Sequence, residues 1–102
     1  MSGKLFNSSG FRTQHELARR GMMNSVVRKI QSVIDYRTAH KIVPTHAPRR
    51  SLQDTMSVEE LKLLDSMVEL KLVKAIRGIH YNSYTVDYEA WNAFWARIDK
   101  MG

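Results

Sequence analysis

The chain has 102 residues, 43% of them hydrophobic and 25% charged, and its 16 Lys and Arg against 10 Asp and Glu leave a formal net charge of +6. This length and composition indicate one globular domain, and they exclude a disordered chain or a large enzyme with a cleft between two lobes. The absence of cysteine excludes disulfides, thiolate metal ligands and thiol nucleophiles.

The first helical pattern follows an N-terminal stretch that is rich in small and polar residues. Residues 1–11 contain two Gly and three Ser, and we expect them to form a flexible arm. Thr13 and Glu16 have the spacing of a capping box, and Gly21 is expected to break or weaken the helix that they start. A longer helix then follows and is expected to end near residues 40–42. Its apolar stripe consists of Met23, Val26, Val27, Ile30, Val33 and Ile34.

The middle of the chain predicts a connector and a second long helix. Residues 43–50 contain two prolines and are expected to form a basic connector, followed by a short helical turn over residues 51–54. Ser57 and Glu60 form a second capping box, which predicts a helix over residues 57–72. Its expected apolar face consists of Val58, Leu61, Leu64, Met67, Val68 and Leu72, widened by Leu63 and Leu70.

The pattern then changes to a period of two, which predicts a β-hairpin. Its strands are expected on either side of a tip at residues 78–83. Asp87 is expected to cap a last helix. The apolar stripe of that helix consists of Trp91, Phe94, Trp95 and Ile98.

The order of helix, short turn, helix and two-stranded hairpin resembles the winged helix-turn-helix superfamily over residues 26–88. The leucine-rich helix runs into the first wing strand at residues 70–73, and the second strand returns at residues 84–87. The resemblance implies a mainly α protein with a small β-hairpin (α+β), with a long N-terminal helix and an aromatic C-terminal helix. Residues 12–102 would then form a single winged-helix-like domain.

Charge is distributed unevenly along the chain. Residues 1–50 have ten basic and two acidic residues, a net of +8, whereas residues 51–102 have six basic and eight acidic residues, a net of −2. Such a basic half attracts polyanions, and double-stranded DNA is the partner that we expect, although a basic surface without a partner is the alternative. The expected DNA-binding residues are, first, Arg49, Arg50, Lys74 and Arg77; second, Arg19, Arg20, Arg28 and Lys29; and, at the wing, His80, Tyr81 and Asn82.

The helix over residues 57–72 departs from this expectation because its exposed side is acidic. Glu59, Glu60, Asp65 and Glu69 are expected on that solvated face, where phosphates would be repelled. Either the segment of residues 51–56 beside the two arginines contacts DNA, or the helix contacts a protein.

Catalytic and metal chemistry has little support in the sequence. The four histidines (His15, His40, His46 and His80) lack the paired spacing of zinc ligands, and the carboxylates have no apolar pocket that would shift their pKa. Glycine-rich phosphate loops and nucleophile elbows are absent. We therefore expect no enzyme activity, no metal and no cofactor.

Two functions follow from these features. The first is a DNA-binding transcriptional regulator of the phage or mobile-element kind, cytoplasmic or nucleoid-associated, with no membrane contact. It would pair as a homodimer through Trp91, Phe94, Trp95 and Ile98, unless these residues form the core of one subunit. The second is an adaptor or inhibitor that binds a protein of the transcription or replication machinery. RNA binding is a third alternative.

Overall fold

A computed structural model describes the backbone of residues 3–78 and 82–101, and the side chains of residues 19–78 and 82–100. The elements in chain order are α1 (Gly3–Ala39), β1 (Ala47–Pro48), α2 (Arg49–Gln53), α3 (Val58–Glu69), β2 (Val73–Arg77), β3 (Asn82–Val86) and α4 (Tyr88–Met101). The strands form one antiparallel sheet in the order β1-β3-β2. The expectation of a mainly helical α+β protein is therefore confirmed.

Helix α1 differs from the sequence-based prediction at its start and in its continuity. Its backbone is helical from Gly3, where a flexible arm was expected, and it runs through Thr13 and Gly21 without a break. A glycine costs only about 1 kcal/mol inside a helix, which does not offset the hydrogen bonds on either side of it. The predicted end is confirmed, because Lys41 has φ 56° and the Ile42 N–H donates to the Arg37 carbonyl over 2.8 Å.

Helix α3 begins at the predicted capping box. The Ser57 hydroxyl accepts from the Glu60 N–H, and the Glu60 carboxylate accepts from the Ser57 N–H. The helix ends at Glu69, three residues earlier than predicted, and the turn that follows places Lys71 at φ 64°. Leu72 then donates its N–H to the Met67 carbonyl over 2.9 Å and leads directly into β2.

The predicted β-hairpin is confirmed, with Val73 paired to Val86 at its base and Arg77 paired to Asn82 near its tip. Its second strand starts at Asn82, two residues earlier than predicted, so that the end of the expected tip at residues 78–83 is part of β3. The third strand was not predicted. Ala47 and Pro48, expected in an irregular connector, pair with Tyr84 and Ser83 of β3. Helix α2 begins immediately after them at Arg49, two residues earlier than the predicted turn. Proline is compatible with this position because β1 is an edge strand.

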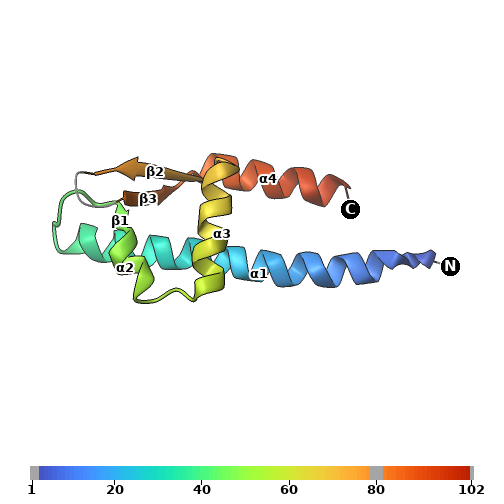
Figure 1. Cartoon of the computed structure of the whole chain (residues 1–102). Coiled ribbons are helices and arrows are strands. Elements are labelled where there is room, and N and C mark those ends of the chain that lie inside the picture. Colours follow the sequence, from blue (N-terminus) through green and yellow to red (C-terminus); the bar gives the residue numbers. More distant parts are fainter. Residues whose placement is uncertain (1–2, 79–81, 102) are drawn as a thin grey trace.

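The core lies where α3 crosses α1, and it also includes residues of the sheet and of α4 (Figure 1). The predicted stripe of α1 is confirmed, with Val26 and Ile30 fully buried. Trp91 and Trp95 of α4 belong to the same core cluster, each 8% exposed. Val58 and Leu70 are corrections, because these two predicted core residues of α3 are 63% and 55% exposed at the ends of the helix.

Helix α4 runs alongside the N-terminal half of α1. The start of α1 and the end of α4 therefore lie at one end of the molecule, and the hairpin lies at the other (Figure 1). Arg20 of α1 joins the two helices by an ion pair of 3.0 Å with Asp99. The molecule is elongated, with principal extents of 56 × 26 × 23 Å. Within the described residues, no helix has the length and apolar character that a bilayer span requires.

Candidate nucleic-acid interface

Arg49 belongs to the first set of four residues that we expected to bind DNA, and it is the most constrained of them by contacts within the chain. Its Nη1 donates to Asp65 Oδ1 of α3 over 2.9 Å and to the Tyr84 hydroxyl of β3 over 2.8 Å. The Asp65 carboxylate, followed by the Tyr84 hydroxyl, raises the pKa of Arg49 above its ordinary value. Arg49 therefore joins α2, α3 and the sheet, and part of its charge is neutralised within the chain.

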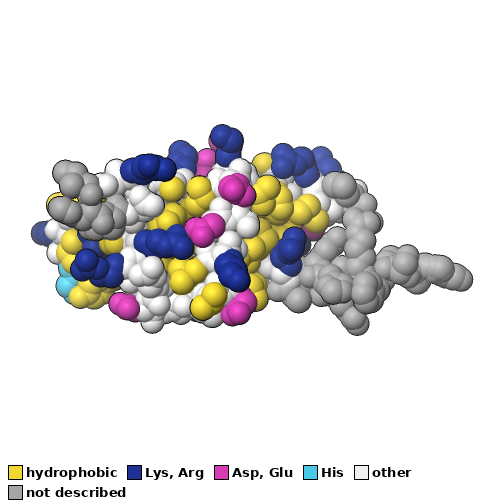
Figure 2. Space-filling view, viewed as in Figure 1, with side chains coloured by type: hydrophobic (Ala, Val, Ile, Leu, Met, Phe, Trp, Pro, Cys, Tyr) yellow, Lys and Arg dark blue, Asp and Glu magenta, His cyan; other side chains and the backbone are white. Residues whose placement is uncertain are grey.

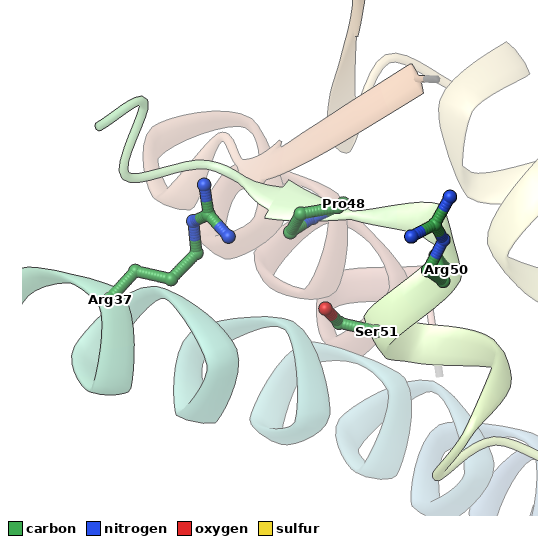
Figure 3. Close-up of a pocket in the computed structure, with 4 residues that line it drawn as sticks. All are labelled: Arg37, Pro48, Arg50 and Ser51. Carbon is green, nitrogen blue, oxygen red and sulfur yellow. The ribbon is translucent and has the colours of Figure 1, made fainter. Parts of the chain in front are cut away.

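Arg50, by contrast, is exposed at the start of α2. It borders a shallow cavity of about 180 Å³ together with Arg37 of α1, Pro48 and Ser51. Figure 3 shows the two guanidinium groups on either side of Pro48. The described ion pairs of this chain include neither Arg37 nor Arg50.

The hairpin presents Lys74 and Arg77 on opposite faces of the sheet, because side chains alternate along a strand. Lys74 is 4.0 Å from Asp87, at the limit of an ion pair. Arg77 is exposed and lines a cleft of about 230 Å³ between α3 and the hairpin. The other residues that line this cleft are Asp65, Val68, Ala75, Asn82 and Tyr84.

Helix α1 contains the second set of residues that we expected to bind DNA, and two of these four cations form ion pairs with carboxylates of the same chain. Arg20 pairs with Asp99, and its guanidinium carbon lies 4.4 Å from the centroid of the Trp95 ring. Lys29 pairs with Glu60. Arg19 and Arg28 are exposed. At the wing, Asn82 lies in β3, whereas His80 and Tyr81 are outside the described residues.

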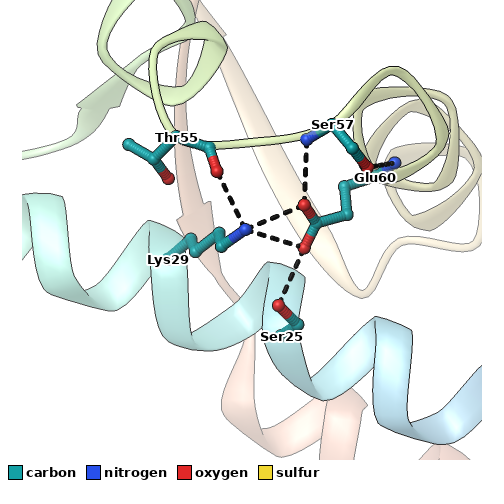
Figure 4. A network of polar contacts seen from close by, with 5 residues as sticks. All are labelled: Ser25, Lys29, Thr55, Ser57 and Glu60. Carbon is teal, nitrogen blue, oxygen red and sulfur yellow. Dashed lines mark hydrogen bonds and ion pairs between the residues drawn. The ribbon is translucent and has the colours of Figure 1, made fainter.

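The network around Glu60 was not predicted and corrects its expected place on a solvated face. Glu60 is 8% exposed, and its carboxylate accepts from Lys29 Nζ over 2.8 and 3.1 Å and from the Ser25 hydroxyl over 2.7 Å (Figure 4). Lys29 also donates to the Thr55 carbonyl over 2.8 Å. The capping box indicated the Ser57 contact, but no local pattern indicates that α1 supplies a lysine to this carboxylate.

The outer face of α3 has mixed charge with an acidic excess. Glu59, Asp65 and Glu69 are exposed there with Lys62, and Figure 2 shows acidic and basic side chains interspersed over this helix. Asp65 is paired with Arg49, whereas the described ion pairs do not include Glu59 or Glu69. Dense contact between this helix and DNA phosphates is therefore unfavourable.

Metal chemistry has no candidate in the described part of the chain. No group of three or more His, Asp or Glu residues is placed there to hold an ion. His40 stacks on Tyr36 with ring centroids 4.1 Å apart, and His46 is half-buried. The side chains of His15 and His80 lie outside the described residues.

The two tryptophans expected at a core or an interface belong to the core of their own chain. Trp91 and Trp95 pack edge to face with centroids 5.6 Å apart, and Phe94 and Ile98 are half-buried against the same cluster. The core interpretation is thus confirmed for the two tryptophans, and the pairing of two copies stays a prediction.

No protein family, curated protein or solved structure is detectably similar to this chain.

Proposed function

We propose that this chain is a small winged-helix protein that binds double-stranded DNA through its phosphate backbone. Two observations support the fold assignment: α2 and α3 are joined by a short turn, and a two-stranded hairpin follows α3 directly. In such domains the helix pair and the wing approach neighbouring parts of the duplex. The proposed contacts are made by the wing and by the start of α2.

Arg77 is the residue on which this proposal depends most. It is exposed beside Asn82 in the cleft between α3 and the hairpin, and the ion pairs described in this chain leave it without a carboxylate partner. The one carboxylate that lines this cleft, Asp65, is paired with Arg49, which reduces its repulsion of a phosphate. Arg50 supplies a second exposed guanidinium, and Arg is well suited to phosphate oxygens because its donors form a planar fork.

The test is fluorescence-anisotropy binding to a random duplex across a range of salt concentrations. We expect Arg77→Glu and Arg50→Glu each to weaken binding about tenfold or more at low salt and to reduce the slope of log K against log salt by about 1. Arg97→Glu is the matched control, because it makes the same charge change on an exposed residue of α4, at the other end of the molecule (Figure 1).

Equal losses in all three variants would show that only net charge matters and would reject this interface. Wild-type protein that does not bind at low salt would reject DNA binding altogether. Light scattering on the same sample measures whether the protein is the expected homodimer.

A second function, protein binding by α3, is favoured by one specific observation. Val58 and Leu70 are largely exposed at the two ends of this helix, with the carboxylates Glu59 and Glu69 beside them. Apolar groups next to unpaired acids suit a basic protein partner better than DNA. A pull-down that survives nuclease treatment and is lost in Val58→Ser/Leu70→Ser would support this function, and recovery that is sensitive to nuclease would support DNA binding.

A further inference from the structure

The cavity between the C-terminal half of α1 and the start of α2 presents two arginines and a hydroxyl to one space. Arg37 and Arg50 flank Pro48, and the Ser51 hydroxyl lies between the two helices (Figure 3). Arg37 Nε donates to the Pro44 carbonyl over 2.8 Å, which holds the guanidinium in place and leaves its terminal nitrogens for another acceptor. Arg37 is therefore positioned before any ligand binds, and Arg50 supplies a second, exposed guanidinium to the same cavity.

The charge of this cavity is uncompensated by the residues that line it. None of its four lining residues is acidic, and the carboxylates of the described ion pairs are engaged elsewhere, by Arg20, Lys29, Arg49 and Lys74. An anion bound in this cavity is attracted by both guanidinium groups. Phosphate oxygens match the fork of donors on each arginine.

A second hollow adjoins the cavity and differs from it in chemistry. It has a volume of about 310 Å³, shares Arg37 and Ser51 with the first, and is otherwise lined by Ser32, Val33, Tyr36 and Ile42. The Tyr36 side chain is largely exposed, and its stacking on His40 restricts the orientation of the ring. Val33, Ile42 and Tyr36 give this hollow apolar and aromatic surface that suits a planar ring, and Ser32 adds a hydroxyl.

We propose that the two hollows together bind a mononucleotide, with its phosphate between Arg37 and Arg50 and its base beside Tyr36. A volume of about 180 Å³ is smaller than the roughly 300 Å³ of ordinary small-molecule pockets, so the first cavity accommodates the phosphate and the adjoining hollow the base. This site is separate from the cleft of Arg77 between α3 and the hairpin. Arg50 is the one residue that it shares with the proposed DNA interface.

The experiment is calorimetric titration of the DNA-free protein with AMP, inorganic phosphate and adenosine. We expect AMP to bind more tightly than either of its parts. Arg50→Gln should weaken AMP binding about tenfold or more, because it removes a charge-assisted contact to phosphate. Tyr36→Leu should weaken AMP binding but leave inorganic phosphate unchanged, and Arg97→Gln should leave both unchanged. Arg50, Tyr36 and Arg97 are all exposed, so these variants should keep the fold.

AMP that does not bind at millimolar concentration would overturn the proposal. It would also be overturned if AMP and inorganic phosphate bound equally and Tyr36→Leu had no effect, because the base would then have no site. Arg77→Glu separates this inference from the proposed function: the variant should bind DNA about tenfold or more weakly and bind AMP as the wild type does. Loss of AMP binding in Arg77→Glu would contradict a separate nucleotide site.

Discussion

Glu60 shows how one side chain can link two helices through several donors. Its carboxylate accepts from Lys29, from the Ser57 N–H and from the Ser25 hydroxyl. These donors, with Lys29 the strongest, lower the pKa of Glu60 from its ordinary 4.5 to about 2. The N-terminus of α3 is thereby attached to α1, and Lys29 is engaged in the fold rather than available to a ligand.

Glu60→Gln should lower the free energy of unfolding at pH 7 by about 1–3 kcal/mol, because Lys29 then lacks a carboxylate partner. The pKa of Glu60 is depressed in the folded state, so its carboxylate stabilises the fold above about pH 4.5 and this stabilisation is lost as the pH falls toward 2. Urea denaturation at pH 7 and near pH 2.5 measures the free energy of unfolding of both proteins. The wild type should exceed the variant by less at pH 2.5 than at pH 7.

A difference of the same size at both pH values would contradict the role of the carboxylate charge. Glu59→Gln is the matched control. Glu59 is exposed on the same turn of α3, and its substitution should change stability by less than about 0.5 kcal/mol.

At the scale of elements, the sequence predicted the helices and strands that have a periodic pattern of apolar residues or a capping residue. The stripe from Met23 to Ile34 predicted the packed part of α1, and Ser57 and Asp87 predicted the starts of α3 and α4. Strand β1 has only two residues, too few to show a period, and it exists because β3 offers it a free edge. The continuity of α1 through Gly21 was missed because glycine weakens a helix without ending it.

Gly21→Ala should raise the free energy of unfolding by about 0.5–1 kcal/mol. Gly21 is exposed inside α1, and a Cβ added there meets no atom within 4 Å, so the variant gains helix propensity without a clash. Urea denaturation measures the change. Gly21→Pro is the opposing test: it should destabilise a continuous helix by about 3 kcal/mol, and a tolerated proline would show that the helix breaks there.

At the scale of the whole molecule, the basic and acidic halves of the sequence neutralise part of each other. Three cations of the N-terminal half, Arg20, Lys29 and Arg49, pair with Asp99, Glu60 and Asp65 of the C-terminal half. The charge asymmetry of the sequence therefore overstates the positive charge that faces solvent. The cations that stay available for a partner, among them Arg50 and Arg77, are a smaller set than composition indicates.

Trp91 attaches α4 to the rest of the molecule, so Trp91→Ala should strongly destabilise the fold. Trp91 is 8% exposed in the common core, so its truncation should lower the free energy of unfolding by about 3–5 kcal/mol. Denaturant unfolding followed by circular dichroism measures this. Asn92→Ala changes an exposed neighbour on the same helix and should have little effect. A small loss in Trp91→Ala would show that α4 does not pack as described.

Sequence patterns were sufficient for the α+β class, the β-hairpin, the capped starts of α3 and α4, and the tryptophans as candidate core residues, because caps and periods act over a few neighbouring residues. They could not show which cations remain available to a ligand. The hydrogen bonds that engage the other cations join residues far apart in the sequence. The separation is 16 residues for Arg49 and Asp65, 31 for Lys29 and Glu60, and 79 for Arg20 and Asp99. Such pairs form only when packed helices bring the two side chains within hydrogen-bonding distance, and the same packing places Arg37 and Arg50 on one cavity.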